Sequence, residues 1–302
     1  MTPLRLAPPA ARQGPGRIPP TLLEALDLVV AKRTAGALPG DRRGAGMGMG
    51  TELAQLRPYE VGDDVRQIDA SATARMGEPY VRLQVPERTL TTWLVVDVSP
   101  SMAFGTGRRL KADVAEGIAG VVAQLSVRRA GRVALVTFGA GRPRLLPPRA
   151  ARRGVIAVRR ALAAGVAPDG TRDPDGLSRA LLRLREVATQ PGLVVVVSDF
   201  RDHRGWERAL GAVGALHSVL AVEVRDPREG ELPDVGHLAL VDPETGEQVE
   251  VDTRSRTLRE RFARIEAERR ARVASELRRL QVQHVVLTTA GDWLRDFGRG
   301  VR

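Results

Sequence analysis

Two serines and an aspartate that directly follow an apolar segment are the residues best placed for chemistry in this sequence. Asp97 comes after the apolar run 94–96, and Ser99 and Ser101 follow it at alternate positions. Alternate side chains of an extended loop can point to the same side, so one carboxylate and two hydroxyl groups can converge. Together with water, such oxygen ligands suit Mg²⁺, a hard ion that prefers octahedral oxygen coordination.

Two further loops carry oxygen ligands. The apolar run 194–197 ends in Ser198 and Asp199, and Thr171 precedes a helix expected from about residue 175. Ligands of an open parallel sheet bind beyond the carboxyl ends of its strands, so these loops should meet. The pattern predicts a Mg²⁺ (or Mn²⁺) site formed by Asp97, Ser99, Ser101, Thr171 and Asp199. Three aspartates in the loop of Thr171 could replace it: Asp169, Asp173 and Asp175. The alternative is that Asp97 and its serines merely form a turn.

The elements that must position these loops begin at about residue 90. Apolar strands alternate with amphipathic helices, which predicts a doubly wound, mostly parallel α/β sheet over 91–302. We expect strands at 94–96, 132–138, 193–197, 218–224 and 284–288, and helices at 109–127, 152–164, 175–188, 206–216, 258–280 and 293–297. The turn residues 242–246 between two short apolar segments predict a β-hairpin at about 236–252.

The chain before residue 90 has a different composition. Residues 1–34 are expected to be a disordered tail, rich in Pro, Gly and Arg, with a short amphipathic helix at 21–33. Residues 35–50 are glycine-rich and expected to form a loop. The run Gly-Met-Gly-Met-Gly at 46–50 has no strand before it and no clear helix after it, which argues against a dinucleotide fingerprint.

Residues 43–75 form a block dense in charge. Gly62-Asp63-Asp64 is expected to be a turn, and Arg57, Arg66 and Arg75 are spaced to meet Asp63, Asp64 and Asp69. One interpretation is a solvated loop whose ion pairs contribute little stability. The other is a rigid platform or a partner-binding edge. The candidate partner-binding residues are Arg57, Tyr59, Asp63, Asp64, Arg66 and Asp69.

The charged block resembles the signature of a bacterial family called domain of unknown function 58 (DUF58). The matching residues are Arg43-Gly44-Ala45-Gly46, Glu52, the run 56–69 (LRPYEVGDDVRQID) and Ala74-Arg75, followed by Asp97-Val98-Ser99-Pro100-Ser101-Met102. The resemblance covers roughly residues 35–297. The chain departs from the family pattern at Ala70, where the family has Trp, and at Leu53, where it has Phe.

This resemblance implies a von Willebrand factor A-like domain with a metal-ion-dependent adhesion site. By that likeness Ser99, Ser101 and Thr171 would bind the metal directly, and Asp97 and Asp199 would act largely through water. One coordination position would stay open for a carboxylate of a partner protein. The family resemblance also implies an adaptor or co-chaperone role for a MoxR-type AAA+ ATPase.

The amino-acid composition and one position of the motif bear on two other functions, nucleic-acid binding and phosphatase activity. The net charge of +11 comes almost entirely from arginine, since Lys32 and Lys111 are the only lysines, and only 3% of residues are aromatic. That argues against a nucleic-acid binder, as does the alternation of Arg and Glu along 254–279. A haloacid-dehalogenase-type phosphatase needs a second aspartate where Ser99 stands, so we expect no enzyme. The absence of cysteine, of a signal peptide and of a membrane-length apolar run predicts a cytosolic protein without a membrane span.

Overall fold

The computed structural model describes residues 52–85, 90–107, 109–201 and 204–301. The expected tail and helix within 1–34 and the glycine-rich segment 35–50 lie outside these residues. The chain divides into two compact units, one formed by residues 42–89 and the other containing residues 90–302.

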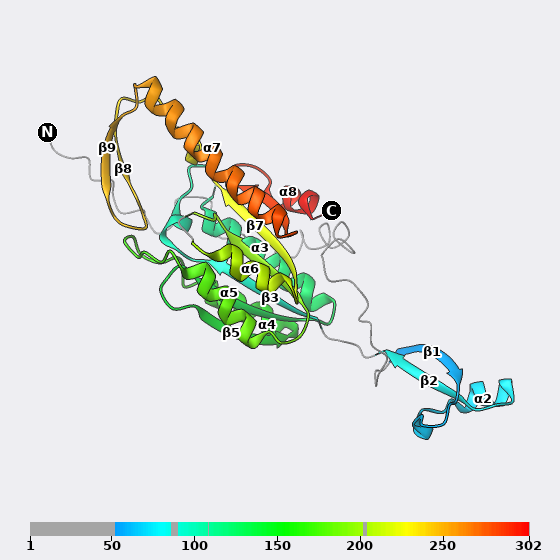
Figure 1. The fold of residues 1–302 in the computed structure, drawn as a ribbon. Coiled ribbons are helices and arrows are strands. Elements are labelled where there is room, and N and C mark those ends of the chain that lie inside the picture. Colours follow the sequence, from blue (N-terminus) through cyan, green and yellow to red (C-terminus); the bar gives the residue numbers. More distant parts are fainter. Residues whose placement is uncertain (1–51, 86–89, 108, 202–203, 302) are drawn as a thin grey trace. The chain divides into compact units, whose positions relative to one another are not determined.

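A six-stranded sheet forms the centre of the larger unit (Figure 1). Its strand order is β10-β7-β6-β3-β4-β5, and every neighbouring pair is parallel except β4 and β5. The strands are β3 (Thr91–Asp97), β4 (Arg132–Phe138), β5 (Arg144–Ala150), β6 (Leu193–Ser198), β7 (Ser218–Arg225) and β10 (Gln283–Thr288). This confirms the predicted doubly wound, mostly parallel α/β class. The antiparallel edge strand β5 was not predicted, because it contains two prolines, which are rare inside strands. An edge strand tolerates them, since one of its sides forms no hydrogen bonds with a neighbouring strand.

Helices cover both faces of this sheet and bury two apolar layers. One layer packs α3 (Lys111–Arg128), α4 (Ala151–Leu162) and α8 (Trp293–Gly300) against the sheet, and the other packs α5 (Gly176–Val187), α6 (Trp206–Gly214) and α7 (Arg256–Arg279). In β3, Leu94 and Val96 face the first layer, and Trp93 and Val95 face the second. The sheet is therefore buried on both faces, which explains why its central strands are continuous apolar runs.

The predicted hairpin forms from β8 (His237–Val241) and β9 (Gln248–Asp252), which pair antiparallel. It leads into α7, and only the second half of the apolar stripe of this helix is buried. Val273 and Leu277 are buried against the sheet, but Ile265 is 49% exposed, because the first half of α7 extends beyond the sheet beside the hairpin (Figure 1).

The smaller unit is a two-stranded antiparallel ribbon with one short helix. β1 (Glu52–Pro58) pairs with β2 (Tyr80–Val85), and between them lie the one-turn helix η1 (Val65–Gln67) and α2 (Ala70–Met76). Asp64 caps η1 and Asp69 caps α2. Asp64 and Asp69 of the charged block thus begin helices, as carboxylates at N-caps do.

Candidate metal centre

Asp97 is fixed at the carboxyl end of the central strand β3. It is buried, and one carboxylate oxygen (Oδ1) accepts a hydrogen bond from the backbone N–H of Ser99 at 2.9 Å. The other oxygen accepts one from the hydroxyl of Ser198, the last residue of β6, at 2.6 Å. Since β3 and β6 are neighbours, this bond joins the first predicted metal loop to the third.

The hydroxyl groups of Ser99 and Ser101 point toward each other. Both residues are buried, and their Oγ atoms lie 3.1 Å apart. Two adjacent ligands of an octahedral Mg²⁺ with bonds of 2.0–2.1 Å would be separated by about 3 Å. The first loop therefore presents two hydroxyl oxygens at the spacing that one small octahedral ion requires.

A glycine makes room for this arrangement. Gly139, just after β4, has a φ of +90°, and a Cβ there would stand 2.7 Å from the Cβ of Ser99 and 2.9 Å from Oδ1 of Asp97. The backbone of β4 supports the same loop, because Val98 donates a hydrogen bond to the carbonyl of Phe138 at 2.8 Å. Any other residue at 139 would clash with the loop and would favour a different backbone conformation.

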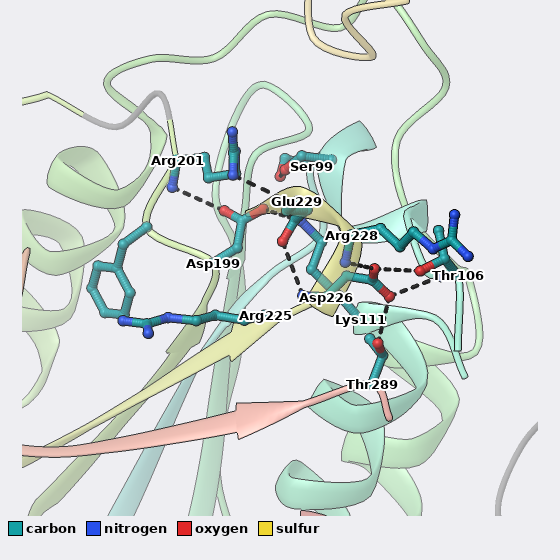
Figure 2. Close-up of polar contacts among 12 residues, drawn as sticks. Ser99, Thr106, Lys111, Asp199, Arg201, Arg225, Asp226, Arg228, Glu229 and Thr289 are labelled. Carbon is teal, nitrogen blue, oxygen red and sulfur yellow. Dashed lines mark hydrogen bonds and ion pairs between the residues drawn. The ribbon is translucent and has the colours of Figure 1, made fainter. Parts of the chain in front are cut away.

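Asp199 follows β6 and contacts a lysine that sequence reasoning missed (Figure 2). Its Oδ2 accepts a hydrogen bond from Nζ of Lys111 at 2.5 Å, and its Oδ1 accepts one from the backbone N–H of Arg201 at 2.9 Å. Lys111 is fully buried and also donates to Oε1 of Glu229 at 2.5 Å. Burial lowers the pKa of Lys111, but Asp199 and Glu229 outweigh it, so the pKa is raised and the ammonium stays charged. A signal existed in the sequence, since Lys111 is one of two lysines among 47 basic residues.

The second predicted loop approaches the first through its backbone. Ala167 donates a hydrogen bond to the carbonyl of Val98 at 2.7 Å. Thr171 is half-buried, and its backbone N–H bonds to Pro168 within the loop. The contact of the second loop with the first thus runs through the backbone of Ala167, whereas hydrogen bonds join Asp97 directly to Ser99 and to Ser198.

Among the three aspartates that could replace Thr171, the structure favours Asp173. Asp169 and Asp175 are exposed, whereas Asp173 is buried. One of its oxygens pairs with Arg179, and the other, Oδ2, is buried without a hydrogen-bond partner. Asp173 packs against Gly176, which in turn lies against the backbone of Gly139. A buried carboxylate oxygen without a partner is costly, and a cation or a metal-bound water would satisfy it.

A second unpredicted residue reaches the first loop from the hairpin. Glu244, in the turn between β8 and β9, is 7% exposed, and its Oε1 accepts a hydrogen bond from the backbone N–H of Ser101 at 3.1 Å. Burial and the charges of Asp97 and Asp199 raise the pKa of Glu244. Glu244 therefore adds a buried carboxylate to the first loop, and the charges of Asp97 and Asp199 act on it.

This donor set fits a hard divalent cation. Its members are carboxylate and hydroxyl oxygens, which suit Mg²⁺ or Mn²⁺. Within the described parts of the chain, no three Asp, Glu or His side chains stand close enough to hold a metal by themselves. A metal here would thus depend on the hydroxyls of Ser99 and Ser101 and on water.

Comparisons with known proteins give the family. The model described as "Protein of unknown function DUF58" matches residues 55–272. The chain belongs to the DUF58 family. Uncharacterised proteins of Mycobacterium tuberculosis and Mycobacterium bovis are each 40% identical to this DUF58 chain over 283 residues, covering 92% of it and 87% of the relative.

Among solved structures, the DUF58 chain is similar to the conserved hypothetical protein BatB from Bacteroides thetaiotaomicron. Their identity is 13%, over 70% of this chain and 97% of that one, with a TM-score of 0.43. It is also similar to a von Willebrand factor type A structure from Catenulispora acidiphila, at 14% identity over 70% of this chain and 42% of that one, with a TM-score of 0.42. No helix in the described residues is long and apolar enough to cross a membrane. The cytosolic location stays a prediction.

The predicted partner-binding residues of the DUF58 signature have different environments. Arg57 donates to Oδ1 of Asp63 at 2.6 Å, which is one pair of the expected charge network. Asp64 accepts from the backbone of Arg66, not from its side chain, and the guanidinium of Arg75 donates to the carbonyl of Ser71.

Burial separates these signature residues further. Asp69 is buried and caps α2, so its observed role is structural. Asp64 and Arg66 are exposed and Tyr59 is half-buried, which leaves them accessible to a partner.

Proposed function

We propose that this protein is a metal-dependent protein-binding module. Ser99 and Ser101 would bind Mg²⁺ (or Mn²⁺) directly, and Asp97 and Asp199 would bind it mainly through water. The observation that carries the proposal is the pair of buried hydroxyl oxygens 3.1 Å apart, next to a carboxylate that links two neighbouring strand ends. Asp173 or Thr171 would supply the second loop's contribution.

The bound ion would recognise a carboxylate of a partner protein, and no reaction is required of it. The site favours this role over phosphatase chemistry, because the position two residues after Asp97 holds Ser99, which cannot serve as the acid that such an enzyme needs. In the Arg-rich helix α7, Glu266 forms ion pairs with Arg201, Arg269 and Arg270. Glu266 thus places a buried acidic group among these arginines, which repels phosphate, so the observations do not favour a nucleic-acid surface.

The partner we propose is a MoxR-type AAA+ ATPase, for which this protein would serve as an adaptor or co-chaperone. The support is membership of the DUF58 family together with a site suited to a carboxylate. The exposed residues Asp64 and Arg66 and the half-buried Tyr59 are candidates for a second contact with the same partner.

Metal binding is tested by thermal unfolding and calorimetric titration with Mg²⁺ and Mn²⁺. At a free metal concentration of about 100 times the Kd, the free energy of unfolding of the wild-type protein should rise by about 2.7 kcal/mol. Asp97→Asn and Ser101→Ala should lose most of that gain, whereas Asp175→Asn, at an exposed aspartate of the second loop, should keep it. Circular dichroism of each variant without metal checks that it is folded. A wild-type protein that shows neither heat nor a thermal shift with either ion would overturn the proposal.

The partner is tested with a purified MoxR-type ATPase from the same organism. Binding should require Mg²⁺ or Mn²⁺, disappear with a chelator and weaken at least about tenfold, or 1.4 kcal/mol, in Asp97→Asn. Binding that is equally strong with the chelator would show that the metal is not the recognition element.

A further inference from the structure

The β8–β9 hairpin has its one buried carboxylate at its tip. Its strands are half-buried or exposed, and Val241 and Val249 are 45% and 56% exposed. Glu244 is the exception, with 7% of its surface exposed. A hairpin that contributes little to the core yet buries a charged group at its end has a role at the place where that group lies.

The turn is built to hold Glu244 in position. Asp242 accepts hydrogen bonds from the backbone N–H of Glu244 and from the hydroxyl of Thr245, both at 2.9 Å. The carbonyl of Asp242 also accepts one from Gly246 at 2.7 Å, and Gly246 has a φ of +74° that favours glycine. These bonds fix the backbone at the tip, from which the Glu244 side chain reaches the backbone N–H of Ser101.

The tip docks between two of the proposed metal loops. Glu244 accepts from the backbone N–H of Ser101 in the first loop, and the carbonyl of Pro243 accepts from Gly170 in the second loop at 2.8 Å. Gly170 directly precedes Thr171. The hairpin therefore covers the site with a carboxylate at the side where the two loops meet.

A cation at this point would offset the negative charges that surround the tip of the hairpin. The carboxylate of Glu244 lies in the field of Asp97 and Asp199. The buried ammonium of Lys111 already bonds to Asp199 and Glu229. Carboxylates buried close together repel one another strongly unless a cation stands among them.

We propose that Glu244 is itself a ligand of the metal and fills the position that a partner's carboxylate would take. This inference rests on the proposed metal site. The hairpin is then a built-in competitor, and a partner binds by displacing its tip. Release needs no unfolding of the core, because the hairpin's base is held separately by hydrogen bonds from Thr253 to the carbonyl of Gly236 at 2.7 and 2.8 Å.

The docked tip should weaken the binding of any carboxylate that competes with Glu244 for the metal. A binding-competent state populated to a fraction f weakens the apparent affinity by the factor 1/f. If the docked tip leaves the site open about a tenth of the time or less, removing the Glu244 carboxylate should tighten the binding of a carboxylate ligand about tenfold or more.

The experiment compares wild type with Glu244→Gln and with the control Glu247→Gln. Glu247 is an exposed glutamate of the same turn, so the two variants lose the same charge from the same hairpin. Each protein is loaded with Mn²⁺, and water-proton relaxation measures how many waters contact the ion. Glu244→Gln should gain about one water relative to wild type and to Glu247→Gln, and acetate should bind its Mn²⁺ complex about tenfold more tightly. Hydrogen exchange of residues 237–252 should slow on adding Mg²⁺ in wild type and in Glu247→Gln but not in Glu244→Gln.

The outcomes separate this inference from the proposed function. If wild type binds Mn²⁺ but Glu244→Gln shows the same hydration, the same acetate affinity and the same metal-dependent exchange, Glu244 is not a ligand and the metal site stands. If wild type binds no Mn²⁺, the metal site and the inference fail together.

Discussion

Replacing Lys111 with methionine tests the charge balance beside the candidate metal site. Methionine keeps the length of the side chain and removes the ammonium, which lies 2.5 Å from Asp199 and 2.5 Å from Glu229. Removing one partner of a buried ion pair typically costs 3–5 kcal/mol because the remaining charge is uncompensated. Here both acids keep another polar contact, Asp199 with the backbone of Arg201 and Glu229 with its guanidinium at 3.9 Å. We therefore expect the lower end of that range, about 3 kcal/mol.

The assay is thermal and denaturant unfolding in a metal-free buffer. A loss of about 3 kcal/mol should lower the Tm by roughly 6–12 °C for a unit of this size. Mg²⁺ should then restore more stability in Lys111→Met than in wild type, because a negative charge beside the site is no longer neutralised and attracts the ion more strongly. The double variant Lys111→Met/Glu229→Gln should recover part of the metal-free loss, since one uncompensated carboxylate has been removed. If the free energy of unfolding of Lys111→Met lies within about 1 kcal/mol of the wild-type value, this account of the buried charges is refuted.

Three further predictions concern other parts of the molecule. Gly139→Ala should cost about 1–3 kcal/mol and weaken Mg²⁺ binding because its Cβ would press on Ser99, whereas Gly141→Ala, which has a φ of +82° but open space around it, should cost less and leave calorimetric Mg²⁺ binding intact. Burial lowers the pKa of His217, so its contribution to stability is complete above its ordinary value and is lost as the pH falls below about 6.5. His217→Gln should therefore flatten the stability profile on the acid side of neutrality, and an unchanged slope in denaturant titrations would contradict this. Asp69→Ala should remove the N-cap of α2 at a cost of about 1 kcal/mol, seen as faster hydrogen exchange in residues 70–76 than in wild type.

Local patterns were enough to predict the framework of the fold. β3 and β6 are buried on both faces, so their sequences are unbroken apolar runs that stand out against the charged helices. Because parallel strands place their carboxyl ends at one edge, the contact of Asp97 with Ser198 at the end of β6 followed from the class of sheet. The edge strand β5 lacks such a run and contains two prolines, which is why periodicity did not reveal it.

The residues that complete the site could not be predicted in this way. Lys111 is 88 positions from Asp199, and Glu244 is 143 positions from Ser101. Neither follows an apolar strand, and each becomes part of the site only because a helix start or a hairpin tip is brought to the same edge of the sheet. Tertiary contacts between such distant segments leave no periodic trace in a single sequence.

Lys111 and Glu244 act on the proposed site in opposite directions, and together they limit what can bind there. Lys111 lowers the negative charge at Asp199, which weakens the attraction for a cation, and Glu244 raises it. Exchange of Glu244 for a carboxylate of a partner would leave the total charge unchanged, so a bound metal would be retained during the exchange. A neutral or basic group in the same place would leave the cation less compensated and would give up the charge-assisted hydrogen bond from Ser101. The selectivity for an acidic residue would then come from the charge that the hairpin has already placed in the site.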